Sequence, residues 1–153
     1  MNIQVSQVLV RFLEKLGVQC IFGIHGSHIL PVYDSLYSSS IRTVLAKHEQ
    51  GAAFMAGVHG RLTGSPAVCL GTLGPGATNL ITGVADSNMD RAPMLVLTGQ
   101  GSTERLHKES HQIMDVVALF EKEQIPVRMI PTRVVPETYS GSIHPWWRER
   151  YDE

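Results

Sequence analysis

A single carboxylate stands where an apolar stretch gives way to small residues. Glu49 ends the run "IRTVLAKHE" and is followed by Gly51, Ala52 and Ala53. A carboxyl group in such a crowded place is partly shielded from water, and desolvation favours its protonated, proton-donating form. Two interpretations follow from these residues: an acid–base group in a binding site, or a glutamate in the first turn of a helix, where the helix dipole favours negative charge.

The second chemically informative segment is "LGTLGPGATN". Gly74 and Gly76 remove side chains from a sharp turn that Pro75 stiffens, while Thr72 and Asn79 add hydrogen-bonding groups. Such a turn can line a ligand site, or it can be a tight strand-to-helix connection whose glycines serve packing alone. The spacing fits neither GxGxxG nor GxxxxGK[ST], so it does not indicate a dinucleotide site or a P-loop.

The histidines raise the question of a metal. His25 and His28 are three residues apart, and His107 and His111 are four apart, a spacing that can place two ligands on one helix face. Neither pair has a cysteine next to it in the sequence. We therefore predict no metal site in this chain.

Helical and extended segments alternate in a way that explains how these groups could meet. Helices are predicted over 4–16, 29–37, 50–62, 77–89 and 108–122, and strands over 18–24, 41–48, 67–73 and 94–99. The strands are short and apolar throughout, which is typical of a sheet covered on both sides. We predict an α/β fold, a doubly wound and mostly parallel sheet with helices on both faces, and ligand sites beyond the carboxyl ends of its strands.

Length and composition suit one domain. The chain has 153 residues, 18% of them charged, and a formal net charge of -1, so no strong field indicates nucleic acid or a membrane surface as a partner. No apolar stretch approaches the roughly 20 residues of a membrane span. Cys20 and Cys69 lie in apolar runs, which suggests buried, reduced thiols in a cytoplasmic protein. We place the domain at 1–122, with a strand that could continue to 130, and predict an irregular tail over 131–153.

Four sequence blocks occur in an order that resembles a known family. They are "KHEQGAAFMA", "GRLTG", "TLGPGATNLITGVADSNMDRAPMLVLTGQ" and "HQIMDVVALF". Together they closely resemble the N-terminal, pyrimidine-binding domain of thiamine-diphosphate enzymes, above all the acetolactate synthase group. The resemblance spans residues 3–121 and implies the thiamine-diphosphate-binding fold.

The resemblance implies a role for Glu49. In the family, the glutamate of the "HE" motif hydrogen-bonds N1′ of the cofactor's aminopyrimidine and exchanges a proton with it, which activates the cofactor towards 2-keto acids such as pyruvate. Decarboxylation and carboligation follow, with the cofactor as electron sink. The cofactor-binding residues carried over by the resemblance are Gly26, Glu49, Thr72, Gly74, Pro75, Gly76, Asn79 and Gln112. His111 is either a contributor or a solvated helix residue.

Some positions depart from the family pattern. The loop "GIHGSHIL" has His25 where relatives usually carry proline, and Gly57 and His59 stand where relatives often carry aspartate and tyrosine. The GDG…N motif, which holds magnesium and the diphosphate on a later domain of the family, is absent from this sequence. The family's active site also forms between two subunits, so we expect a homo-oligomer and a site completed by the diphosphate-binding domain of another subunit or chain.

Several functions stay open on this basis. The chain can be a truncated product or isolated domain of an acetolactate-synthase-like enzyme, inactive alone. It can be the small subunit of a two-chain 2-keto acid decarboxylase, a non-catalytic pseudo-domain that dimerises or regulates, or a nucleotide-binding domain. The residues do not decide whether FAD binds in a full-length enzyme, or which substrate and acceptor are used.

Overall fold

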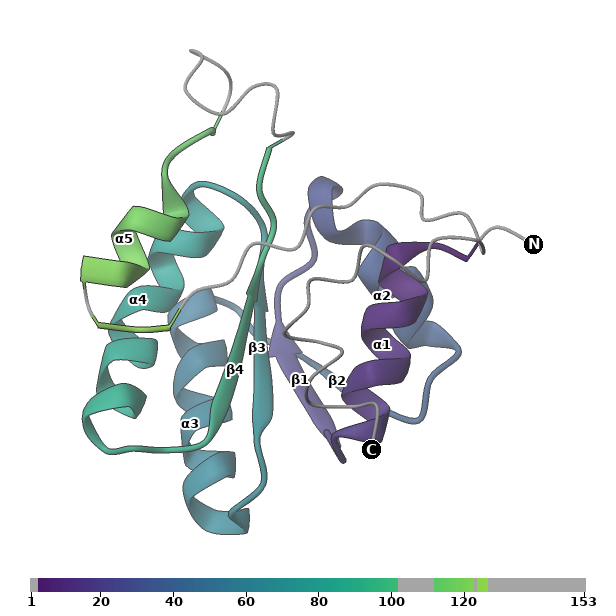
Figure 1. Ribbon diagram of the computed structural model, residues 1–153, viewed down its shortest axis with the longest axis horizontal. Helices are drawn as coiled ribbons and strands as arrows, with labels where there is room; N and C mark the ends of the chain where they lie inside the picture. Colours follow the sequence, from purple (N-terminus) through teal and green to yellow (C-terminus); the bar gives the residue numbers. More distant parts are fainter. Residues whose placement is uncertain (1–2, 102–111, 123, 127–153) are drawn as a thin grey trace.

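A four-stranded parallel sheet forms the centre of the protein in the computed structural model, which describes residues 3–101, 112–122 and 124–126. The strands are β1 (Cys20–Gly23), β2 (Arg42–Leu45), β3 (Ala67–Gly71) and β4 (Met94–Thr98). Their order across the sheet is β2-β1-β3-β4, and Phe22 pairs with Val44 on one side and with Cys69 on the other. The predicted parallel α/β sheet is confirmed (Figure 1).

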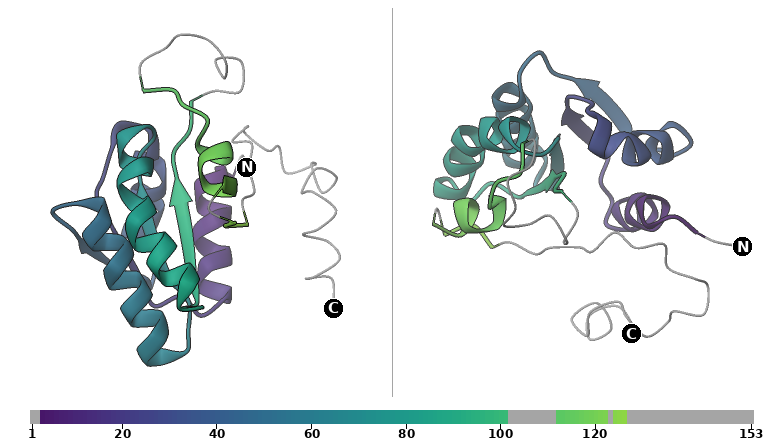
Figure 2. Two further views of the ribbon diagram at one scale, coloured as in Figure 1. Left: turned by 90° about the vertical axis from the view of Figure 1, so that its left-hand side faces the viewer. Right: turned by 90° about the horizontal axis from the view of Figure 1, so that it is seen from above.

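Helices cover both faces of this sheet, as predicted. One face carries α1 (Val5–Lys15), the short 3-10 helix η1 (Ser27–Ile29) and α2 (Leu30–Tyr37), and the other carries α3 (Glu49–Thr63), α4 (Pro75–Met89) and α5 (Val116–Lys122). The two layers are seen from the side in Figure 1 and from above in Figure 2. Within the described part of the chain, no helix is long and apolar enough to span a membrane.

The central strands bury residues on both faces because successive side chains point to opposite sides. Ile21 and Val68 pack in the core under α1 and α2, whereas Phe22 and Cys69 pack under α3 and α4. This explains why β1 and β3 are apolar throughout. The prediction that the strands are covered on both sides is wrong for β2, which is mostly exposed at the edge of the sheet. Both cysteines are free and buried, as predicted, and burial raises the pKa of the Cys69 thiol to about 12.

The winding of the chain creates a switch point between β1 and β3. From β1 the chain passes through α2 to β2 at one edge of the sheet, and it then returns through α3 to β3 on the other side of β1. The connections that leave the carboxyl ends of β1 and β3 therefore run to opposite faces. In open α/β sheets this is the position where ligands bind.

The fifth helix begins later than the sequence indicates. Helix α5 starts at Val116, not at residue 108, and residues 112–115 are not helical. Gln112 has a φ of +58°, which breaks a right-handed helix, and the Asp115 carboxylate accepts a 2.9 Å hydrogen bond from the backbone N–H of Ala118, as a helix-capping residue does. The predicted residues 108–111 lie outside the described residues, as does the 131–153 tail. Of the possible strand over 125–130 only Ile125 and Pro126 are described, and they are not in a strand.

Helices α3 and α4 approach each other closely through small residues. A Cβ at Gly83 would lie 2.7 Å from the Ala53 Cβ, and a Cβ at Gly57 would collide with the Ser87 hydroxyl oxygen. That hydroxyl is buried and has no hydrogen-bond partner. An alanine or larger residue at either glycine would therefore push the two helices apart.

We expect Gly57→Ala to lower the free energy of unfolding by about 1–2 kcal/mol, because the overlap with Ser87 outweighs the gain of about 1 kcal/mol in helix propensity. Ser87→Ala removes an unpartnered buried hydroxyl and should be neutral or stabilising. The double variant should recover the stability lost in Gly57→Ala. Urea denaturation of the four proteins measures this, and a double variant as unstable as Gly57→Ala would contradict the packing described.

Candidate functional site

The loops after β1 and β3 touch at the switch point. Gly26 precedes η1, and Thr72 follows directly after β3. A Cβ at Gly26 would lie 2.6 Å from the Thr72 Cβ and 2.8 Å from its Oγ1. Because Gly26 has no side chain, the Thr72 side chain can occupy this position.

The turn into α4 has a backbone shape that requires glycine. Gly74 has φ +59° and ψ −120°, a combination that residues with a Cβ rarely adopt. Pro75 opens α4 with its fixed φ and is exposed, and the carbonyl of Gly74 accepts 3.0 Å hydrogen bonds from the N–H groups of Ala77 and Thr78. The "GPG" sequence therefore bends the chain from strand directly into helix, with the Gly74 carbonyl paired.

Glu49 lies at the start of α3 and reaches across to α4. The preceding residue, His48, caps the helix: its Nδ1 accepts a 3.2 Å hydrogen bond from the N–H of Gln50. The half-buried carboxylate of Glu49 accepts a 3.0 Å hydrogen bond at Oε2 from Nδ2 of Asn79. Its Oε1 lies 3.4 Å from the position that a Cβ on Gly76 would occupy.

These contacts link Thr72 to the carboxylate. A Cβ at Gly76 would lie 2.8 Å from the Thr72 Cγ2 as well as near Oε1 of Glu49. The missing side chain of Gly76 thus lets the Thr72 side chain and the Glu49 carboxylate pack closely against the first turn of α4. A half-buried acid with one oxygen held by Asn79 keeps its other oxygen for exchanging a proton with a bound group.

Gln112 reaches the same region through its backbone. A Cβ at Gly74 would lie 2.7 Å from the Gln112 carbonyl oxygen and 2.9 Å from its Cβ, while the residue itself is exposed. The structure therefore brings Gly26, Glu49, Thr72, Gly76 and Asn79 into one chain of contacts, and it places Gln112 beside Gly74 and the exposed Pro75 at the adjoining turn. His111 lies outside the described residues.

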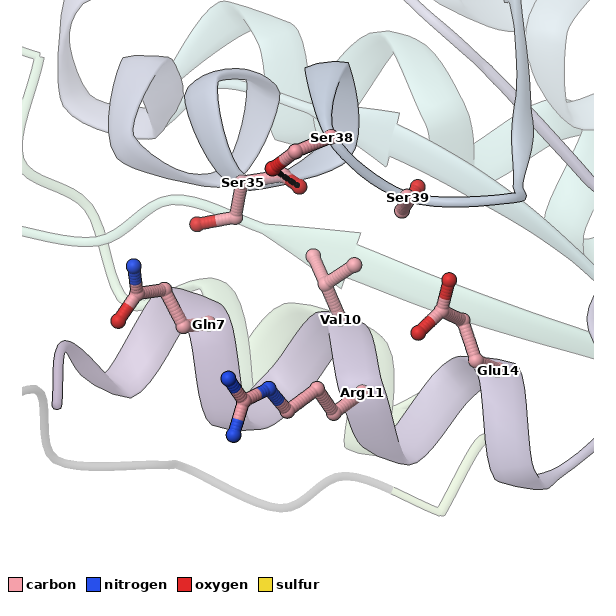
Figure 3. Close-up of a pocket in the computed structure, with 7 residues that line it drawn as sticks. All are labelled: Gln7, Val10, Arg11, Glu14, Ser35, Ser38 and Ser39. Carbon is pink, nitrogen blue, oxygen red and sulfur yellow. Dashed lines mark hydrogen bonds between the residues drawn. The ribbon is translucent and has the colours of Figure 1, made fainter.

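A cavity of about 150 Å³ lies elsewhere, between α1 and α2 (Figure 3). It is lined by Gln7, Val10, Arg11, Glu14, Ser35, Ser38 and Ser39. The Glu14 carboxylate accepts hydrogen bonds from the backbone N–H of Ser40 at 2.8 Å and from its hydroxyl at 3.0 Å, and these bonds hold the pKa of Glu14 below its ordinary value. The cavity belongs to the other helical layer and shares no residue with the Glu49 site.

The described residues contain no group of three His, Cys, Asp or Glu side chains that could hold a metal ion. Within the "GIHGSH" loop, the ring of His28 is paired through Nδ1 with the Ser27 hydroxyl at 3.1 Å, and His25 is exposed. Of the second histidine pair, both His107 and His111 lie outside the described residues. The loop histidines are thus not gathered into a ligand set in this part of the chain.

One exposed apolar surface is not predicted from the sequence. Phe54, Met55, Val58 and Leu62 are 37%, 37%, 49% and 82% exposed, and we call them the outer face of α3. Residues 54, 58 and 62 recur every fourth position, which places them on one side of the helix. The signal that could have found this face is that small residues, from Ala53 to Gly60, occupy the opposite side and leave no room for these large ones.

Comparison with known proteins gives a consistent result. Residues 3–119 match the family model described as thiamine pyrophosphate enzyme, N-terminal TPP binding domain. The acetolactate synthase large subunit of Corynebacterium glutamicum is 46% identical over 112 residues, 72% of this chain and 18% of that protein. The acetolactate synthase isozyme 1 large subunit of Escherichia coli is 44% identical over 115 residues, 74% of this chain and 20% of that protein.

A third relative extends the similarity along the chain. The probable acetolactate synthase large subunit of Methanocaldococcus jannaschii is 42% identical over 140 residues, 90% of this chain and 23% of that protein. This match is longer than the 1–122 segment, so it continues into the region for which the sequence predicts a tail. The chain spans about a fifth of the length of the relatives it matches.

The backbone at Gly74 gives a testable consequence. We expect Gly74→Ala to lower the free energy of unfolding by about 2–4 kcal/mol, because a Cβ adds backbone strain and a clash with Gln112. Gly51→Ala is the matched control: Gly51 lies in α3 with open space around its Cα, so alanine should stabilise the protein by about 0.5–1 kcal/mol. Thermal and urea unfolding measure both changes, and equal responses would contradict the strained turn.

Proposed function

Because the chain belongs to the thiamine pyrophosphate enzymes, as their N-terminal TPP-binding domain, we propose that it is the pyrimidine-binding half of an acetolactate-synthase-like active site. The substrates of this site are 2-keto acids such as pyruvate, and the reactions are decarboxylation and carboligation. The observation that carries the proposal is the half-buried Glu49 carboxylate, held at Oε2 by Asn79 of α4, with Oε1 beside the backbone of Gly76. The similarity to acetolactate synthase large subunits supports the reaction class.

The residues present fit the aminopyrimidine end of thiamine diphosphate. A flat heterocycle packs well against backbone and small groups, and Gly26 and Gly76 bring the loop after β1 and the first turn of α4 close around Thr72. A ring nitrogen needs a proton-exchanging partner, which Glu49 supplies. Gly74, Pro75 and Gln112 form the adjoining turn and would border the same ring. We assign Mg²⁺ and the diphosphate to a separate domain, of another subunit or chain.

The residues of this chain bind, orient and transfer a proton. Thiamine diphosphate, when bound, supplies the electron sink for the loss of carbon dioxide and for transfer of the remaining two-carbon unit. With the cofactor bound, Glu49 would share a proton between Oε1 and the ring nitrogen. The turn from Gly74 to Gly76 would border the ring with a backbone shape that Gly74 fixes. We assign any FAD site to the full-length enzyme.

We expect Glu49→Gln to lower turnover of pyruvate roughly 10²–10⁴-fold, since glutamine has the same shape and cannot exchange the proton. The assay uses the chain together with a diphosphate-binding domain of an acetolactate synthase, thiamine diphosphate and Mg²⁺. Glu121→Gln, an exposed change on α5, is the control and should leave the rate unchanged.

An unchanged rate in Glu49→Gln would refute this role. A wild-type assembly without turnover would instead favour the non-catalytic pseudo-domain. Two of the departures from the family pattern do not favour that alternative: Gly57 admits Ser87 of α4, and the His59 ring packs against Phe22 with 6.1 Å between ring centroids. Both act in the packing of the middle of α3, away from its first turn.

The outer face of α3 suits the partner that the proposal requires. It begins one helical turn after Glu49, and it places four exposed apolar side chains on the helix that carries the acid. An apolar surface of this kind is characteristic of an interface between proteins. We propose that the partner's diphosphate-binding domain covers this face in a homo-oligomer or a two-chain enzyme.

We expect Val58→Asp to weaken association with the diphosphate-binding domain at least about tenfold, because it buries a charge in the interface. Val8→Asp is the matched control: Val8 is the same residue type, 46% exposed against 49% for Val58, and lies on α1 in the opposite layer. Sedimentation velocity and calorimetric titration measure the change. Equal weakening by the two substitutions would contradict an interface on α3.

A further inference from the structure

We propose that Asn79 is a positioning residue for Glu49 and that it assigns different tasks to the two carboxylate oxygens. Asn79 holds Oε2, and Oε1 is the oxygen that exchanges the proton with the cofactor. This inference rests on the proposed function of Glu49. It replaces the direct cofactor contact that the family resemblance suggests for Asn79 with a contact to the acid.

The first support is the hydrogen bond itself. Nδ2 of Asn79 donates to Oε2 of Glu49 over 3.0 Å, and both side chains are partly buried. A side-chain amide is uncharged, so it can hold Oε2 whether the carboxyl group is ionised or protonated at its other oxygen. Since Oε2 is occupied as an acceptor, the proton of the acid form is directed to Oε1.

The second support is what lies in front of Oε1. Oε1 stands 3.4 Å from the position that a Cβ on Gly76 would occupy, and the hydrogen bond from Asn79 goes to the other oxygen. The Thr72 side chain packs beside Gly76 and against Gly26. Oε2 is therefore the oxygen held by the protein, and Oε1 is the one left to exchange the proton.

The third support is the rigidity of the frame. Glu49 lies in the first turn of α3, and Asn79 lies near the start of α4. The two helices are held at a short distance by Gly83 against Ala53 and by Gly57 against Ser87. Donor and acceptor therefore stand on elements that cannot separate without disturbing the core, and this keeps the acid in one orientation.

One test needs no bound cofactor. The side-chain amide signals of Asn79 are followed by ¹⁵N NMR in the full chain and in its Glu49→Gln variant. We expect the Asn79 signals to move, because the charged acceptor becomes an amide, whereas those of Asn88, exposed on α4, stay in place. Unmoved Asn79 signals would overturn the inference and leave the proposed function of Glu49 intact.

A second test separates positioning from cofactor binding in the assembly with the diphosphate-binding domain. We expect Asn79→Ala to lower kcat roughly 10–10²-fold, the scale of a misplaced acid–base group, while the Kd of thiamine diphosphate changes less than about threefold. Asn79→Asp should lower kcat further, because it replaces the donor by a second carboxylate beside Glu49. Asn88→Ala is the control and should leave both constants unchanged.

The outcomes are distinct. A raised Kd with an unchanged kcat would make Asn79 a cofactor contact and overturn the inference, and so would an Asn79→Asp variant as active as wild type. Unfolding curves of Asn79→Ala and Asn79→Asp show whether the two variants are folded. If Asn79→Ala destabilises α4, the isosteric Asn79→Asp variant carries the test. If Glu49→Gln and the Asn79 variants all keep full activity, both the inference and the proposed function of Glu49 fail. If only the Asn79 variants keep full activity, the inference fails and the proposed function of Glu49 stands.

Discussion

The close approach of α3 and α4 is the constraint on which the rest of the site depends. Small residues allow the two helices to meet, and their starts then lie near enough for Asn79 to reach Glu49 over 3.0 Å. A wider spacing would leave the acid without its partner and would also move the turn at Gly74. The stability of the helix pair and the geometry of the acid are thus set by the same contacts.

The sheet adds the second requirement, which is the meeting of two loops that are far apart in the sequence. Gly26 follows β1 and Thr72 follows β3, and they touch because β1 and β3 are parallel neighbours with the same end at one edge. β2 lies on the other side of β1, so the chain must change direction between these strands. The winding of the chain sets the position of the site, and the individual side chains determine its chemistry.

Much of the fold could be predicted from the sequence, because strands buried on both faces and helices with one apolar face leave distinct patterns. The Glu49 and Gly74 segments could be predicted as site candidates because each follows a strand. The start of α5 was predicted wrongly: Gln112 has a left-handed φ and packs against Gly74, a contact between distant positions. The hydrogen bond from Asn79 to Glu49 could not be predicted either, because it also joins distant positions and no local sequence pattern indicates how closely two helices approach.

The burial of Cys69 has a practical consequence. Its sulfur lies under α3 and α4, with a pKa of about 12, so at neutral pH it is neither ionised nor exposed to alkylating reagents while these helices cover the sheet. Reaction therefore requires this helical layer to move away from β3. The rate of Cys69 alkylation would measure how often this layer opens over the strand that leads directly into Thr72.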